Sequence, residues 1–224
     1  MKLRALIENF DDKKEKILRW IIENELNGKI SDSLLAFYNR TKDDPIEDFI
    51  KNVDDGYPAA NPKIEAFVKR IKSIKINEDG TVSIPEFFPL YPVNNDFPSP
   101  PPFKFKDVMD FQLSDFPVIK EIPSWFPESL DTLLIFDCSD VSLHNIHRTI
   151  KTCNLIKVDG EKSAVTKCIL GLTKIKGLEE IELPTTNQEQ LHLEAIVNKY
   201  LPEGDIFELQ DELEKNGFNE QAKI

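Results

Sequence analysis

His144, His147 and Cys138 lie close together in the sequence and are residue types that bind zinc or act in hydrolases. Such a site needs further ligands or a partnered base at suitable spacing, and the sequence offers no second pair. The segment 140–148 has the character of a surface loop, so we expect two solvated histidines, no metal and no catalytic residue. A small α/β enzyme of hydrolase type, using carboxylates or the two histidines in a cleft, remains the alternative hypothesis.

The other reactive side chains also have structural explanations. Cys153 falls on an apolar core position and Cys168 lies among aliphatic residues, so we expect both to be buried thiols. Three cysteines without a CxxC pair indicate reduced thiols. Acidic pairs such as Asp54 and Asp55 lie at expected helix ends, where carboxylates accompany turns. The eight glycines form no phosphate-binding loop, so we expect no cofactor.

The composition is that of one ordinary globular domain, or of two small ones that share a core: 224 residues, 40% hydrophobic and 30% charged. Forty acidic against 28 basic residues give a net charge of −12, which argues against nucleic acid and favours a protein partner with a neutral or basic surface. The sequence shows neither a long apolar run nor a signal-peptide pattern, so we expect no membrane contact and a cytoplasmic protein.

The first third of the chain has helical spacing of its apolar residues. Asp12 and Glu15 form a capping-box pattern at its first expected helix. Apolar spacing and cap signals predict four helices, over about 12–27, 33–41, 45–54 and 62–71. Alternating residues around Asn77–Gly80 then predict a β-hairpin over 73–84. Residues 1–84 are therefore expected to form a helical N-terminal cap with a hairpin.

A proline-rich segment separates this region from the second half. Residues 85–102 contain seven prolines, which remove amide donors too often for a helix or a central strand. We expect 85–104 to be a stiff connector or extended arm, and its aromatic residues favour packing along the body of the protein.

The second half repeats an apolar pattern at intervals of 22, 23 and 25 residues. Each unit ends in two apolar residues two positions apart, and these pairs are Phe111 and Leu113, Leu133 and Ile135, Ile156 and Val158, and Ile181 and Leu183. A weaker fifth unit begins at Ile206 and predicts a last strand. Residues two apart share one face of a strand, and one such row is too narrow to be stable alone. Stacking the units makes the rows a continuous core and the strands a parallel sheet.

This pattern resembles the leucine-rich repeat, L-x-x-L-x-L-x-x-N/C, over residues 105–210. Cys138 and Thr186 occupy the Asn/Cys position in two units, whereas Phe116 and Glu161 depart from it. The resemblance implies an α/β fold with 105–224 as a short leucine-rich-repeat arc: parallel strands, outer helices or loops, and an α-helical N-terminal cap. A mixed α/β domain with strands at similar intervals is the competing hypothesis.

Strand alternation places a second set of side chains on the opposite, concave face of the expected sheet. The candidate partner-binding residues on this face are Thr132, Leu134, Phe136, Leu155, Lys157, Asp159, Glu180 and Glu182. An apolar centre of Leu134, Phe136 and Leu155 inside a charged rim is typical of a protein-binding patch. Alternatively, the proline-rich arm covers it.

Leucine-rich-repeat proteins generally hold a protein partner on the concave face. The resemblance therefore implies a non-enzymatic protein-binding module. An inhibitory or immunity-type subunit is a further alternative, compatible with small size and acidity.

Overall fold

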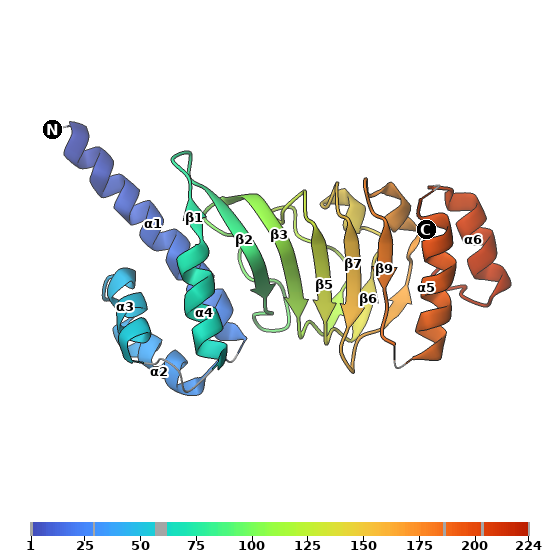
Figure 1. Cartoon of the computed structure of the whole chain (residues 1–224), viewed down its shortest axis with the longest axis horizontal. Coiled ribbons are helices and arrows are strands. Elements are labelled where there is room, and N and C mark those ends of the chain that lie inside the picture. The colour runs from blue at the N-terminus through green and yellow to red at the C-terminus, as the bar shows by residue number, and fades with distance from the viewer. Residues whose placement is uncertain (1, 29, 57–61, 186, 203, 224) are drawn as a thin grey trace.

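The computed structural model describes residues 2–28, 30–56, 62–185, 187–202 and 204–223 (Figure 1). The helices are α1 (Lys2–Asn27), α2 (Asp32–Thr41), α3 (Ile46–Gly56), α4 (Pro62–Ser73), α5 (Gln188–Tyr200) and α6 (Ile206–Lys215), with 3-10 helices η1 (Ile146–Arg148) and η2 (Leu170–Lys174). One sheet contains β1 (Lys75–Ile76), β2 (Thr81–Leu90), β3 (Lys104–Ser114), β5 (Thr132–Phe136), β7 (Leu155–Asp159) and β9 (Glu180–Glu182), in that order. A smaller sheet contains β4 (Val118–Ile119), β6 (Asp140–Ser142) and β8 (Val165–Lys167).

The larger sheet is parallel from β2 to β9. Phe111 lies opposite Leu133, which lies opposite Ile156, which lies opposite Ile181. All four side chains are 0% exposed. The strand register predicted from the apolar spacing is therefore confirmed.

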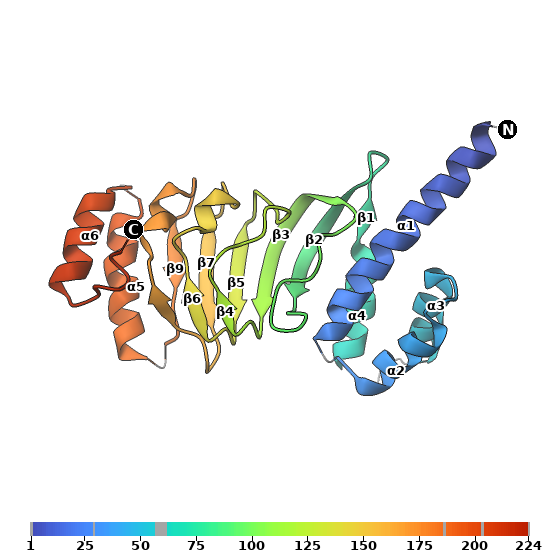
Figure 2. The same ribbon diagram turned by 180° about the vertical axis from the view of Figure 1, so that it is seen from behind.

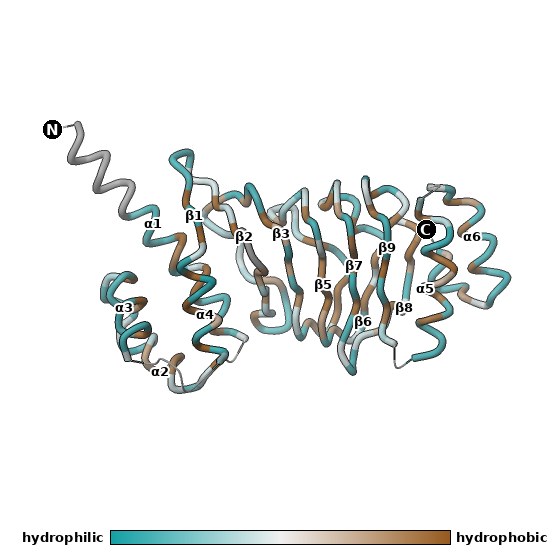
Figure 3. The backbone as a smooth tube through the Cα atoms, viewed as in Figure 1, coloured by the Kyte–Doolittle hydropathy of each residue, from teal (hydrophilic) through white to brown (hydrophobic). Residues whose placement is uncertain are grey.

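The chain winds between the two sheets in stacked coils. After β3, β5 and β7 the chain crosses to a short strand of the smaller sheet (β4, β6 and β8 respectively) and then returns to the larger sheet (Figure 2). Apolar residues recur along the strands, while hydrophilic residues occupy many of the turns between them (Figure 3). Val141, Ile146, Val165 and Leu172 are buried in this core. The molecule is thus a mixed α/β protein built on a parallel sheet of stacked coils, similar to a β-solenoid.

Strand β2 carries the parallel sheet into the proline-rich segment. Phe88 lies opposite Phe111 and Leu90 opposite Leu113, so 88–90 is in register with the repeating units. The expectation that the connector begins at residue 85 is therefore wrong, because β2 continues to Leu90. The reason is that β1 pairs with β2 only at Val82 and Ser83. Beyond them, no strand of the described residues pairs with the outer edge of β2, so a proline there removes no ladder hydrogen bond.

The rest of the proline-rich segment packs along the body, as predicted. The indole of Trp20 on α1 donates to the carbonyl of Ser99 at 3.0 Å. The rings of Phe97 and Phe116 lie 4.6 Å apart, and those of Trp20 and Phe103 lie 5.5 Å apart. Figure 2 shows this segment on the side of the molecule where β4 and β6 lie.

Helices α2, α3 and α4 match the predicted ranges, whereas α1 begins ten residues before Asp12. Asp12 is therefore not an N-cap, and the capping-box prediction is wrong. Its other member, Glu15, instead accepts the backbone amide of Ile46 at 3.1 and 3.2 Å through its two oxygens. A carboxylate at the start of α3 satisfies a free amide and complements the helix dipole, which ties α1 to α3.

The predicted fifth strand is also wrong, because Ile206 begins α6. The Asp205 side chain accepts from the amides of Phe207 and Glu208 at 3.0 and 3.1 Å. This N-cap and the helical spacing of buried Leu209 and Leu213 outweigh a short alternating run.

Side-chain amides meet both outer edges of the parallel sheet. At one edge, the Asn24 amide on α1 donates to the Pro89 carbonyl at 2.8 Å and accepts from the Tyr91 amide at 3.4 Å. At the other edge, Asn198 on α5 accepts from the Ile181 amide at 2.8 Å and donates to its carbonyl at 2.9 Å. These bonds satisfy backbone groups that a further strand would otherwise pair.

Candidate functional site

The outward side chains of β5, β7 and β9 form rows across the larger sheet. The structure brings all eight candidate residues onto this surface, here called the open sheet face: Thr132, Leu134, Phe136, Leu155, Lys157, Asp159, Glu180 and Glu182. Thr132 lies opposite Leu155, which lies opposite Glu180. The rows are fixed by backbone pairing, so the positions of these side chains depend on the coils and not on a loop.

The apolar part of the open sheet face is contiguous. Leu134 and Phe136 are two residues apart on β5, and Leu155 on β7 is the diagonal neighbour of Leu134. Leu134 and Leu155 are half-buried, whereas the Phe136 residue is 37% exposed. A large apolar ring is therefore presented to solvent beside two partly covered leucines.

The charged part of the open sheet face is acidic. The Lys157 ammonium lies 2.6 Å from a carboxylate oxygen of Glu182. This hydrogen bond raises the pKa of Lys157, so the lysine stays charged and paired. Asp159 and Glu180 are exposed, and three carboxylates face one ammonium among the eight residues. The face therefore favours a partner that brings positive charge.

The proline-rich arm does not cover this face. Its Phe97 packs on Phe116, and a depression of about 890 Å³ on the side of the smaller sheet is lined by Asp96 and Phe97 together with Val118 and Thr149. Phe136 keeps its exposure with the arm in place. The alternative in which the arm seals the apolar patch is therefore wrong.

Residues just after the strands complete this region and were missed by the sequence analysis. Asp115 and Asp137 have φ of 60° and 53°, and Gly160 follows at φ 99°. The Asp115 amide donates to the Phe136 carbonyl, and the Asp137 amide donates to the Asp159 carbonyl, both at 3.0 Å. These bonds extend the ladder past the strand ends and hold Phe136 in place. The available signal was an Asp or Gly directly after β3, β5 and β7, because these residues tolerate the left-handed conformation.

His147 lies in the 3-10 helix η1, and His144 lies in the turn that precedes it. Both are half-buried, so the prediction of a solvated pair on a loop is wrong. His147 Nδ1 lies 2.7 Å from the His144 carbonyl, which fixes the ring within the turn. Burial, with positive charge from Lys174 and Arg148, lowers the pKa of both histidines. In the part of the chain that the structure describes, no cluster of three or more His, Cys, Asp or Glu side chains could hold a metal ion.

Two of the cysteines are core residues, as predicted. Burial raises the pKa of Cys138 to about 12 and that of Cys153 to about 11, so both are neutral thiols. Cys168 is only half-buried, which differs from the prediction. Its amide donates to the Glu220 carbonyl at 2.9 Å, so Cys168 packs beside the C-terminal segment and not beside a strand.

Cys138 sits in a stacked polar slot between coils. Its amide donates to Ser163 Oγ at 3.0 Å and its thiol lies 3.6 Å from the Leu113 carbonyl. In the next coil the equivalent position is filled by buried Ser163, whereas the repeat spacing placed Glu161 there. The reason is that the turn after β7 adds residues before the chain re-enters the core. Thr186, the other proposed slot residue, lies outside the described residues.

Comparison with protein-family models, curated proteins and solved structures gives no match. Among the helices of the described residues, none is both long enough and apolar enough to span a bilayer.

Proposed function

We propose that this protein is a non-enzymatic protein-binding module of the leucine-rich-repeat type. The coils from β3 to β9 act as the arc that carries the binding surface, and helices α1–α4 act as its N-terminal cap. The partner is a protein with a basic surface, which docks on the open sheet face.

The repeating architecture supports the family assignment. Successive strands pair in parallel with equivalent apolar residues in register. The Cys138 slot makes hydrogen bonds to the coils before and after it, which is what a buried polar residue at that repeat position must do. The bonds of Asn24 to the outer edge of β2 support a capping role for α1.

The observation that supports the proposed function is the exposure of Phe136, which is 37% exposed on the open sheet face. The exposed part of this ring, beside the half-buried Leu134 and Leu155, is apolar area that a partner can bury, and aromatic residues in such surroundings are the usual anchors of protein interfaces. The carboxylates of Asp159 and Glu180 lie on the same rigid face and supply charge selectivity.

A capture experiment tests this proposal. Tagged wild-type protein and the Leu134→Ser/Phe136→Ser double variant are expressed in the native cells, and co-purifying proteins are quantified by mass spectrometry. We expect a stoichiometric partner with the wild type and at least about a tenfold loss with the double variant, as for loss of a central anchor.

The matched control is Phe207→Ser, because Phe207 on α6 is 77% exposed and lies away from the open sheet face. This variant should retain the partner. Equal capture by the double variant, with its melting temperature unchanged, would refute the assignment of the face.

A further inference from the structure

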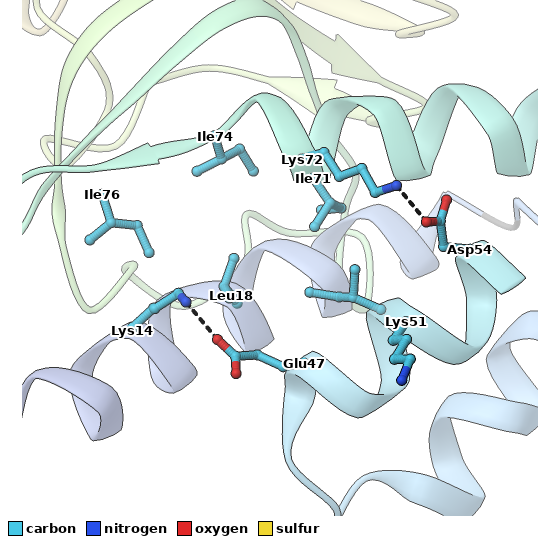
Figure 4. Close-up of a pocket in the computed structure, with 10 residues that line it drawn as sticks. Lys14, Leu18, Glu47, Lys51, Asp54, Ile71, Lys72, Ile74 and Ile76 are labelled. Atoms are coloured by element: carbon cyan, nitrogen blue, oxygen red, sulfur yellow. Dashed lines mark hydrogen bonds and ion pairs between the residues drawn. The ribbon is translucent and has the colours of Figure 1, made fainter. Parts of the chain in front are cut away.

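A cleft between the N-terminal helices and the first strand has an aliphatic floor (Figure 4). Its volume is about 500 Å³. The floor is made by Leu18, Ile50, Ile71, Ile74 and Ile76, from α1, α3, α4 and the start of the hairpin. Leu18 and Ile71 are buried, while the other three are half-buried. A volume of this size and an apolar lining are typical of a small-molecule site.

The mouth of the cleft is rich in lysine. Lys14 and Glu47 form an ion pair at 2.5 Å, and Lys72 and Asp54 form another at 2.5 Å (Figure 4). Lys51, on the same helix as both carboxylates, has no ion-pair partner among the described residues. The lining therefore includes three lysines and two carboxylates, an excess of positive charge in a chain of net charge −12.

We propose that this cleft binds a small organic carboxylate with an aliphatic tail. The tail fits among the aliphatic side chains of the floor, since the lining residues include no aromatic ring that would favour stacking. The carboxylate pairs with Lys51 at the mouth. A cationic ligand is disfavoured there by the excess of lysine.

The mouth can adapt to such a ligand. Both bridging ion pairs are largely exposed, with side-chain exposures of 40% and 67% in one pair and of 52% and 43% in the other. Exposed pairs of this kind contribute little to stability, so Lys14 and Lys72 are free to share the incoming carboxylate. In Figure 4 the Lys51 ammonium points away from the floor, and with no ion pair to hold it the side chain can rotate towards a ligand.

Methyl NMR of the full chain tests this proposal with decanoate as the probe and decyltrimethylammonium as its cationic counterpart. We expect decanoate to shift the methyl signals of Ile50, Ile74 and Ile76 saturably. Lys51→Glu should weaken this binding at least about tenfold, because it places a like charge beside the carboxylate.

Lys16→Glu is the matched control, since Lys16 is an exposed lysine of α1 that does not line the cleft. It should leave the affinity within about twofold of wild type. The proposal is overturned if decanoate causes no saturable shifts, as when the cleft receives a protein segment instead. It is equally overturned if the cationic probe binds as tightly, or if both lysine variants behave alike. None of these outcomes depends on the open sheet face.

Discussion

Asn24 on α1 and Asn198 on α5 each hydrogen-bond the backbone at opposite edges of one parallel sheet. Each side-chain amide bonds a backbone carbonyl and a backbone amide, those of Pro89 and Tyr91 at the end of β2 in one case and both of Ile181 in β9 in the other. Each therefore takes the place of part of a missing strand. Asn24 is 2% exposed, so its two bonds are made in the interior.

Replacing either asparagine by alanine should destabilise the protein and open a sheet edge. We expect Asn24→Ala and Asn198→Ala each to lower the free energy of unfolding by about 1–3 kcal/mol, because edge groups lose their partners. Asn52→Ala, at an exposed position of α3, should have little effect. Urea unfolding measures all three. If the free energies of unfolding of the asparagine variants equal that of the control, the edge bonds do not stabilise the protein.

The register of the core makes a second prediction. Leu133→Ala or Ile156→Ala should each cost about 2–5 kcal/mol, since both side chains are fully buried between the sheets. Thr132→Ala, one position away on the open sheet face, should cost less than about 1 kcal/mol. The melting temperatures of the three variants measure this difference. Equal melting temperatures would contradict a sheet with one buried and one open face.

Gly171 provides a test of the contact between η1 and η2. A Cβ atom at this position would lie 1.9 Å from the His144 carbonyl oxygen, a backbone atom that cannot move alone. Gly171→Ala should therefore cost about 1–3 kcal/mol, as overpacking does. Gly56→Ala is the control, since a Cβ there meets nothing within 4 Å. Equal melting temperatures for the two variants would show that the helical turns are not in close contact.

The histidine turn predicts a pH dependence of stability. The pKa values of His144 and His147 are lowered in the folded protein by burial and by neighbouring cations. Below the unfolded pKa of about 6.5 the unfolded chain binds more protons than the folded one, so stability falls as the pH drops. Above it both forms are neutral and the effect disappears.

The corresponding measurement compares the wild type with a His144→Gln/His147→Gln variant between pH 7.5 and 5.5. The variant should lose less stability on acidification than the wild type. Parallel pH curves would assign the dependence to other groups.

The parts of the fold that could be predicted are those encoded in local spacing. The pairs at Leu133 and Ile135 and at Ile156 and Val158 report which face is buried, and a parallel sheet follows because narrow rows must stack. The same parity placed Leu134 and Phe136 on the open face. The helices α2 to α4 followed from cap residues and apolar period.

The parts that could not be predicted depend on distant partners. Proline composition argued against a strand at Phe88, yet only the tertiary pairing shows that β2 has a free edge there. The exposure of Phe136 likewise depends on where the arm packs, which no local pattern encodes. At Ile206 two local signals conflict, and the Asp205 N-cap, which favours a helix, prevails over the repeat interval, which favours a strand.

Site-specific photo-cross-linking from position 136 tests the central claim most directly. A benzophenone amino acid replaces Phe136 in one protein and Phe207 in another, and both are irradiated in the native cells. We expect one defined protein, with a basic surface, to be cross-linked from position 136 and not from position 207. No adduct from position 136, or the same adducts from both positions, would contradict the assignment of the open sheet face as the binding surface.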